Sequence, residues 1–217
     1  MSVLPFSFTD ILKQNYLYLI LLFFVLFVTA TLKSAWFKGV MGELFVKFLG
    51  KVFLPKDKYH AVHNITLPTR DGTTQIDHVY VSRYGVFVVE TKNMKGWIYG
   101  SEEQIFWTQK IFKKSFRFQN PIRQNYKHVR ALVMLVGEPI PIKSVIVFAG
   151  GAEFKTKMPA NVTKGYGFIR YIKSFENPIL TDRQVDRILR LIEEKRLPPS
   201  RKTDRLHVKN LKKRHRR

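Results

Sequence analysis

Three side chains between residues 76 and 92 have the types and spacing needed for chemistry on a phosphodiester. Residues two apart in a strand share a face, so Glu90 and Lys92 are predicted to project together. If residues 83–84 form a two-residue turn, the pairing places Asp77 directly opposite Glu90 on the neighbouring strand. A slip of one residue would send Asp77 to the other face, so the prediction depends on this register.

Two carboxylates that face each other repel, and the repulsion is relieved if a divalent cation lies between them. Mg²⁺, or Mn²⁺ in its place, takes such oxygen ligands and keeps waters that a substrate phosphate can displace. Lys92 could then orient or deprotonate a bound water, or stabilise charge on the phosphate. The alternative is a solvated Glu90–Lys92 pair on an edge strand. The apolar runs at 79–81 and 86–89 instead favour buried central strands.

Apolar periodicity and turn signals predict the elements that must position these residues. The predicted fold class is α/β, with a mixed sheet flanked by helices. The expected helices cover residues 39–51, 121–136 and 181–196, and the expected strands cover 58–67 (ending at Pro68), 75–82, 86–92, 96–99, 105–109, 143–149 and 167–173.

The helix at 121–136 is predicted from an Asn120 N-cap followed by Pro121 at its first position. One helical stripe of apolar residues is expected to be buried: Ile122, Tyr126, Val129, Val133 and Val136. A second stripe, about 100° away on the helix, is basic and is expected to face outward. It consists of Arg123, Lys127 and Arg130.

The chain has 217 residues, a formal net charge of +22 and no cysteine, which excludes disulfides and thiolate metal sites. Such a charge points to polyanionic partners, namely nucleic acid or anionic lipid. Residues 104–137 contain no acid and seven basic residues, among aromatics that we interpret as core. The candidate nucleic-acid contacts there are Lys113, Lys114, Arg123, Lys127 and Arg130.

Residues 14–32 form an uncharged run with an almost unbroken apolar centre at 17–28, and as a helix this run nearly crosses a bilayer core of about 30 Å. A cleavable signal peptide or a buried core helix are the alternatives. The run is longer than a signal peptide usually has, no small-residue cleavage site follows it, and no polar face appears along it. Lysines are sparse before it and plentiful after it, which predicts a single-pass cell-membrane protein whose C-terminal domain is cytoplasmic.

Three regions are therefore expected: an anchor over residues 1–35, an α/β domain over 36–197 and a basic tail over 198–217. The tail from Arg201 onward has no apolar periodicity and is expected to be disordered. Its expected partners are nucleic acid or the anionic cytoplasmic leaflet.

Several linked motifs between about Trp36 and Val136 resemble the nuclease-related domain (NERD) family. They are Gly42-Glu43, Gln75–His78, Gly85–Asn93, Lys95–Gly100 and Gln119–Gln124. That family is similar in turn to the restriction-endonuclease-like nucleases, whose pattern is an acid on the first helix, an Asp, and then Glu-x-Lys.

The resemblance implies a Mg²⁺-dependent nuclease core with Glu43 as the helical acid, Asp77 as the central acid, and Glu90 and Lys92 as the Glu-x-Lys pair. Spacing alone would make Glu43 an exposed partner of a lysine at i+4. Gln124 resembles a glutamine that some superfamily members place near the scissile phosphate, although it is equally consistent with a solvated helix face. The metal ligands implied are Asp77 and Glu90.

The histidines show no metal-ligand spacing and are interpreted as structural or solvent-facing: His60, His63, His78 and His128. The expected function is that of a membrane-anchored, metal-dependent nuclease acting on DNA or RNA. The alternative is a catalytically inactive module that binds nucleic acid, or tethers to a membrane, on the same fold.

Overall fold

The computed structural model describes residues 8–137 and 140–215, so the start of the expected anchor and the end of the expected tail lie outside this part. Its helices are α1 (Phe8–Lys33), α2 (Ala35–Phe53), α3 (Pro121–Val136), α4 (Gly167–Lys173), α5 (Asp182–Lys195) and α6 (Arg201–His215). Its strands are β1 (Tyr59–Thr69), β2 (Gly72–Ser82), β3 (Gly85–Lys92), β4 (Gly96–Tyr99), β5 (Phe106–Ile111), β6 (Lys114–Gln119), β7 (Ile142–Phe148), β8 (Ala152–Phe154) and β9 (Val162–Lys164).

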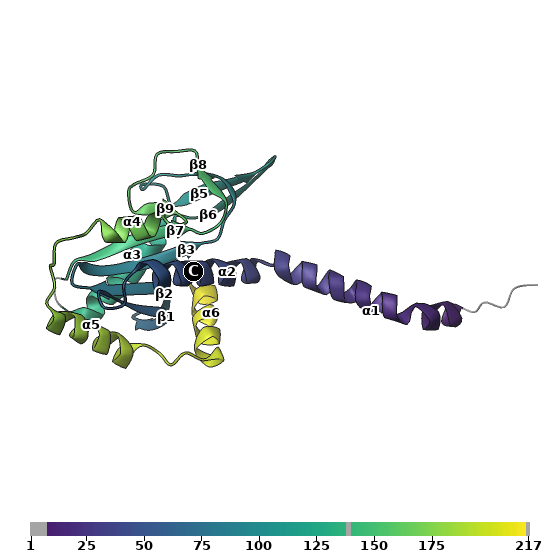
Figure 1. The fold of residues 1–217 in the computed structure, drawn as a ribbon, viewed down its shortest axis with the longest axis horizontal. Helices are drawn as coiled ribbons and strands as arrows, with labels where there is room; N and C mark the ends of the chain where they lie inside the picture. Colours follow the sequence, from purple (N-terminus) through teal and green to yellow (C-terminus); the bar gives the residue numbers. More distant parts are fainter. Residues whose placement is uncertain (1–7, 138–139, 216–217) are drawn as a thin grey trace, which may run out of the picture. The chain divides into compact units, whose positions relative to one another are not determined.

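The strands form two mixed sheets, and this confirms the α/β class while replacing the one sheet expected from the sequence by two (Figure 1). The larger sheet has the order β1-β2-β3-β7-β9, in which β1, β2 and β3 are antiparallel neighbours and β7 runs parallel to β3. The smaller sheet has the order β6-β5-β4-β8. The strands expected at 96–99 and 105–109 are present as β4 and β5 and pair with each other, whereas β6 was not expected.

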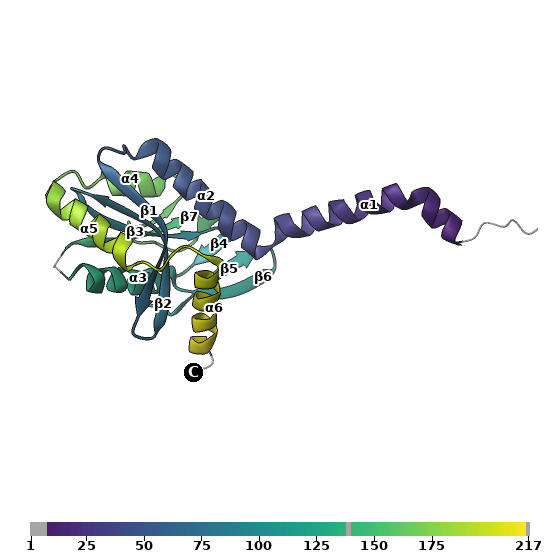
Figure 2. The same cartoon turned by 90° about the horizontal axis from the view of Figure 1, so that it is seen from below.

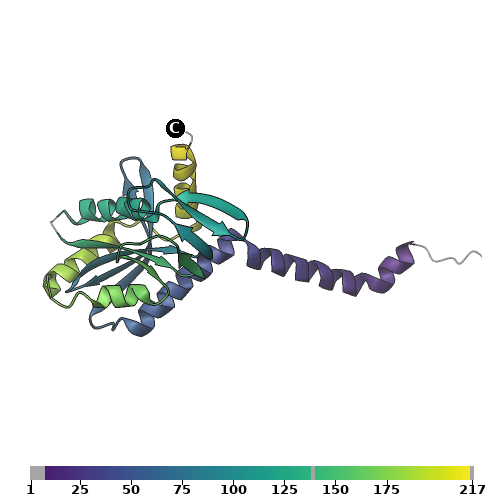
Figure 3. The ribbon, with the colours of Figure 1, turned by 90° about the horizontal axis from the view of Figure 1, so that it is seen from above.

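Helices cover both faces of the larger sheet (Figures 2 and 3). On one face, α3 and α5 pack on the side chains of β2 and β3 that include Val79, Val81, Val86 and Val88. On the other face, the part of α2 that follows Met41 and the whole of α4 pack on Tyr80, Phe87 and Val89. Burial on both faces explains why the central strands are nearly continuous apolar runs.

The predicted register of the central hairpin is confirmed. Ser82 pairs with Gly85, and the pairing continues to His78 opposite Val89. Gly85 has φ +130°, a conformation that favours glycine at this turn. The next pair in this register is Asp77 and Glu90, so both acids lie at the end of the paired part of the hairpin.

The segment 167–173 is a helix and not the strand that we expected. Its buried residues are Phe168, Ile169 and Ile172, whose spacing of one, three and four places them on one side of a helix. They pack against the β3 and β7 side of the core. A short apolar run does not distinguish a strand from a buried helix, and tertiary packing decided between them.

Strand β1 does not end at Pro68 as predicted, because Pro68 pairs with Thr73 and the strand continues to Thr69. Proline is tolerated here because β1 is at the edge of its sheet, where a strand has one side without a partner.

Helix α3 starts with the predicted Asn120 cap, whose side chain accepts a hydrogen bond from the Ile122 backbone N–H at 2.9 Å. The predicted buried stripe is wrong by about one residue. Tyr126 is 59% exposed, whereas the polar residues Asn125 and His128 are buried. Helix α3 presents Asn125 and His128 to the core because both polar side chains have hydrogen-bond partners in the larger sheet.

The expected disordered tail is helical in the described residues. Ser200 Oγ accepts the Thr203 backbone N–H, and the buried Thr203 hydroxyl donates to a main-chain carbonyl. His207 and Asn210, three residues apart and hence on one face, both bond to the Thr73 hydroxyl of β2. These polar contacts, rather than an apolar stripe, hold α6, so a search for apolar periodicity could not find it.

Within the described residues, one helix is long and apolar enough to cross a membrane, over Asn15–Lys33. It coincides with the apolar run predicted as a membrane segment.

Candidate active site

Strands β2 and β3 separate where the candidate site begins. Their main-chain pairing stops after His78 and Val89. One residue further on, an Asp77 carboxylate oxygen accepts a hydrogen bond from the Thr91 backbone N–H at 2.8 Å. A side chain thus replaces the next main-chain bond, while residues 90–92 of β3 remain paired with β7. The Asp77 carboxylate is therefore held at the point where the two strands part.

Glu90, Lys92 and Gln124 form a closed hydrogen-bonded triangle. Lys92 Nζ donates to Glu90 Oε1 at 2.7 Å and to Gln124 Oε1 at 2.8 Å, while Gln124 Nε2 donates to Glu90 Oε1 at 2.7 Å. Lys92 and Glu90 share a face of β3 as predicted, and Gln124 reaches them from α3. The solvated-pair interpretation is wrong, because the Glu90 side chain is only 3% exposed.

His128 completes the contacts of Glu90. Its Nε2 lies 3.2 Å from Glu90 Oε2, and its Nδ1 lies 2.7 Å from the hydroxyl of Thr74 on β2. His128 is four residues after Gln124, so both point to the same side of α3. The interpretation of His128 as structural or solvent-facing, made from metal-ligand spacing alone, missed this contact. The useful signal was its i+4 relation to Gln124.

Asn125 is a second polar residue that the sequence analysis missed. Its side-chain amide donates to Val88 O, Ser144 Oγ and Val145 O at 2.9, 2.9 and 3.3 Å. Asn125 therefore connects α3 to β3 and β7 at the residue next to Gln124, and this connection fixes the position of Gln124 relative to Glu90.

The three acids near the site influence one another's ionisation. Burial and the neighbouring Glu90 carboxylate raise the pKa of Asp77 well above its usual value, against the opposing effect of the Thr91 N–H. Burial and Glu90 likewise raise the pKa of Glu43 on α2. Burial alone would raise the pKa of Glu90, but the Lys92 ammonium and His128 lower it. The surroundings thus favour the ionised form of Glu90, and the charge of Glu90 disfavours ionisation of Asp77 and Glu43.

The residues fit a divalent cation held by few protein ligands. Glu90 Oε2 is buried and has no hydrogen-bond partner in the described part of the chain, since the His128 contact lacks hydrogen-bond geometry. Asp77 is destabilised by a negative neighbour that a cation would neutralise. In the described ranges 8–137 and 140–215, no three acid or imidazole side chains are arranged to hold a metal ion together.

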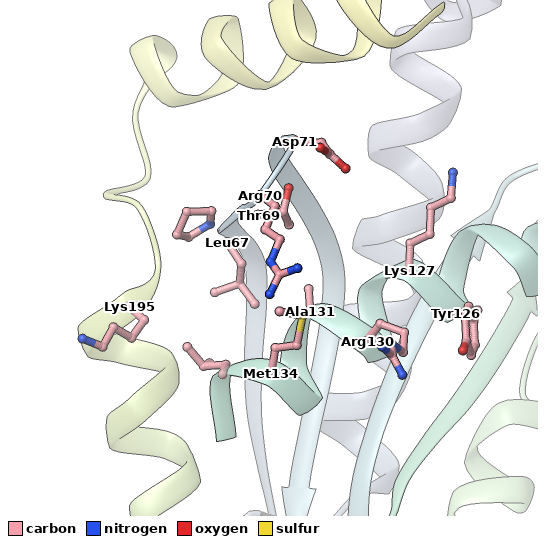
Figure 4. A pocket seen from close by; sticks show the side chains of 12 residues that line it. Leu67, Thr69, Arg70, Asp71, Tyr126, Lys127, Arg130, Ala131, Met134 and Lys195 are labelled. Atoms are coloured by element: carbon pink, nitrogen blue, oxygen red, sulfur yellow. The ribbon is translucent and has the colours of Figure 1, made fainter. Parts of the chain in front are cut away.

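The basic residues of α3 lie on the exposed side of the helix, as predicted. Arg123 donates to the carbonyl of Glu103 at 2.8 Å. Lys127 and Arg130 line a cavity of about 680 Å³ between α3, α5 and the β1–β2 turn, and Figure 4 shows them on one side of it with Arg70 on the other. Lys113 and Lys114 belong to the β5–β6 turn instead, so the structure brings only part of the basic set to the α3 surface.

A mixed sheet whose central strands part around two carboxylates and a lysine defines a nuclease-like α/β core. The chain belongs to the nuclease-related domain (NERD) family, whose model matches residues 38–149. This match covers every residue that we have placed in the candidate site.

The chain is also similar to an uncharacterized protein of Bacillus anthracis, with 50% identity over 112 residues. The similar region covers 51% of this chain and 52% of that protein, so the chain spans about half the length of its relative. No solved structure matches the chain.

Proposed function

We propose that this protein is a membrane-anchored nuclease that hydrolyses phosphodiester bonds of DNA or RNA with Mg²⁺ or Mn²⁺. One observation carries the proposal: the buried Glu90 carboxylate is held by Lys92 and Gln124 beside Asp77, where two central strands part. A domain that only bound nucleic acid would gain from losing these carboxylates, because they repel phosphate.

Asp77 and Glu90 would hold the cation, and Glu43 would add negative charge nearby. When bound, the cation supplies Lewis-acid stabilisation of phosphate charge and lowers the pKa of a ligating water. Lys92, whose ammonium donates to Glu90 and Gln124, would orient the attacking water or stabilise charge on the phosphate. Gln124 keeps the Lys92 ammonium aimed at Glu90, and His128 fixes the other oxygen of Glu90.

The exposed basic residues of α3 would hold the phosphate backbone next to this site. Lys127 is three residues after Gln124, so a nucleic-acid strand lying along α3 would contact Lys127 and the candidate catalytic residues at the same time. Arg70 and Arg130 extend the positive surface into the cavity of Figure 4. Binding of this kind weakens steeply with salt, because each phosphate contact releases counterions.

The apolar helix at Asn15–Lys33 would anchor the domain to the cell membrane in a single pass. The lysines that follow this helix favour a cytoplasmic location for the nuclease domain. The basic residues of α6 would add contacts to nucleic acid or to anionic lipid.

The test is incubation of the purified full chain in detergent with plasmid DNA and with RNA, in the presence of Mg²⁺, Mn²⁺ or EDTA. The proposal expects metal-dependent cleavage by the wild type and none by Asp77→Ala or Lys92→Ala. The matched controls Asp57→Ala and Lys95→Ala change exposed residues of the same types and should cleave normally. Salt-sensitive binding without metal-dependent cleavage would instead establish the inactive binding module.

A further inference from the structure

Helix α2 exposes a continuous apolar stripe that the folded domain does not use. Leu44, Phe45, Phe48 and Val52 are spaced as neighbours on one side of a helix and are between 40% and 60% exposed. The buried residues Val46, Leu49 and Gly50 occupy a different side and pack into the core. Four large apolar side chains in one exposed row mark an interaction surface rather than chance exposure.

Lysines border this stripe. Lys47 follows Leu44 by three residues and Lys51 follows Phe48 by three, so each flanks the apolar row along the same edge. Both lysines are exposed. A helix with an apolar face bordered by lysines is typical of helices that lie in the interface of an anionic bilayer.

The lysine edge of α2 opens into a cationic cavity. The cavity has a volume of about 490 Å³, lies between α2 and the start of β1, and is lined by Lys47, Lys51, Lys56, His60, His63 and Tyr80 among others. Among the residues that the structure describes, no acidic side chain lines it. It can therefore accept an anion the size of a phosphate with little electrostatic cost.

A buried hydroxyl in this cavity has no partner. Tyr80 is 1% exposed, and its hydroxyl makes no hydrogen bond within the described residues. A side chain at Gly50 would collide with this hydroxyl, so the absence of a side chain there lets the hydroxyl pack against α2 beside the cavity. A buried hydroxyl without a partner is costly and is a ready donor to a bound ligand.

Chain connectivity indicates which anion is near. Helix α1 ends at Lys33 and α2 begins at Ala35, so a single residue separates the apolar helix from α2. If α1 spans a bilayer, α2 starts at the membrane surface. Residues 44–52 follow within about 13–26 Å of helix at 1.5 Å per residue.

We propose that α2 lies in the interface of an anionic bilayer, with the apolar stripe among the acyl chains and the phosphate of an anionic phospholipid in the adjacent cavity. Lys47, Lys51 and the Tyr80 hydroxyl hold that phosphate. Residues 44–52 of α2 thereby hold the nuclease domain directly against the membrane surface, so the anchor is not a flexible linker. The inference rests on the membrane anchoring proposed above and does not depend on cleavage activity.

The absence of cysteine allows a direct test with single-cysteine variants of the full chain. Phe48→Cys reports on the stripe, Phe23→Cys on α1, and Met134→Cys serves as an exposed control on α3. Each variant carries a fluorescent label and is reconstituted into vesicles of phosphatidylcholine and phosphatidylglycerol that contain acyl-chain nitroxide lipids. The nitroxide quenches only labels that reach the acyl region.

The proposal expects strong quenching at position 48, several-fold above that at position 134. Strong quenching at position 23 with none at position 48 would overturn the interfacial helix while leaving the anchor intact. Protection of the label at position 48 from water without lipid quenching would assign the stripe to a second protein copy, which also overturns the proposal. None of these readouts involves nuclease activity, so failure of the catalytic proposal is a separate result.

The lipid phosphate has its own measurement. With the label at His60→Cys, at the cavity, head-group nitroxide lipids should quench more in vesicles that contain phosphatidylglycerol than in phosphatidylcholine alone. Lys47→Gln combined with Lys51→Gln should remove that difference, whereas Lys173→Gln, an exposed lysine on α4, should not. Equal quenching at position 60 in both vesicle compositions would show that the cavity selects no anionic lipid. Loss of the quenching in phosphatidylcholine vesicles when inorganic phosphate is added would show the same.

Discussion

The carboxylate of Asp77 accepts a hydrogen bond from the main-chain N–H of Thr91 at 2.8 Å, at the position where β2 and β3 cease to pair through their backbones. This single bond explains how a sheet with buried central strands can open at one end without losing its order. It also fixes one acid of the proposed metal site by a backbone donor, which needs no further side chain.

Asp77→Asn should stabilise the metal-free protein. Because the pKa of Asp77 is raised in the fold, ionisation of this carboxyl costs folding energy, and the cost grows as the pH rises from the ordinary pKa of an aspartate to the raised one. Asparagine removes the charge, and its amide oxygen can still accept from Thr91. We expect a gain of about 1 kcal/mol at neutral pH, or about 2–4 °C in Tm, measured by thermal unfolding in EDTA.

The effect of Mg²⁺ on the Tm tests whether Asp77 is a metal ligand. Mg²⁺ should raise the Tm of the wild type, since a ligand that binds only the folded state stabilises it. It should leave the Tm of Asp77→Asn nearly unchanged. The exposed control Asp57→Asn should respond to Mg²⁺ as the wild type does, and an equal Mg²⁺ response in all three would remove Asp77 from the metal site.

The affinity for Mg²⁺ should increase with pH. Metal ligands must be deprotonated, and the raised pKa of Asp77 means that protons compete with the cation at pH values well above the usual range for an aspartate. Calorimetric titration of the full chain at several pH values measures this. A Kd that stays constant from mildly acidic to mildly alkaline pH would contradict the assignment.

Lys92→Met should reduce cleavage by about 10²–10³-fold, the usual cost of removing one group that stabilises developing charge. Methionine keeps most of the side-chain volume but removes the ammonium that contacts Glu90 and Gln124. Cleavage rates at saturating Mg²⁺ give the magnitude. Lys95→Met provides the control, and far-ultraviolet circular dichroism shows whether the buried Glu90 still permits folding.

His128→Leu should shift the acid limb of the pH–rate profile to higher pH. His128 helps to lower the pKa of Glu90, so its removal raises that pKa and less of Glu90 is ionised at a given pH. A role in folding alone would lower activity equally at every pH. A profile of unchanged shape would therefore reject His128 as a residue that positions and tunes Glu90.

Asn125→Ala should destabilise the domain by about 2 kcal/mol, because it leaves buried acceptors on β3 and β7 without their donor. This corresponds to a fall of about 4–8 °C in Tm for a chain of this size. Asn177→Ala, at an exposed asparagine, should change the Tm little. Urea titrations of both variants would reveal whether the loss occurs in the folded state with an unchanged m value.

The central hairpin illustrates what local sequence can determine. A two-residue turn sets the pairing of β2 with β3, and the period of two then decides which side chains share a face, so Asp77, Glu90 and Lys92 could be placed before any coordinates. The Asn120 cap could be predicted in the same way, because a cap depends on contacts within one turn.

The rotation of α3, the helix at 167–173 and the packing of α6 were decided only by the tertiary structure. Asn125 and His128 are buried because their partners lie on β2, β3 and β7, far away in sequence, and apolar periodicity carries no information about such partners. Charge, composition and local spacing thus determined the hairpin acids and the apolar helix. The meeting of Gln124 and His128 with Glu90 was decided by long-range polar contacts, whose energy appears only when separate segments are brought together.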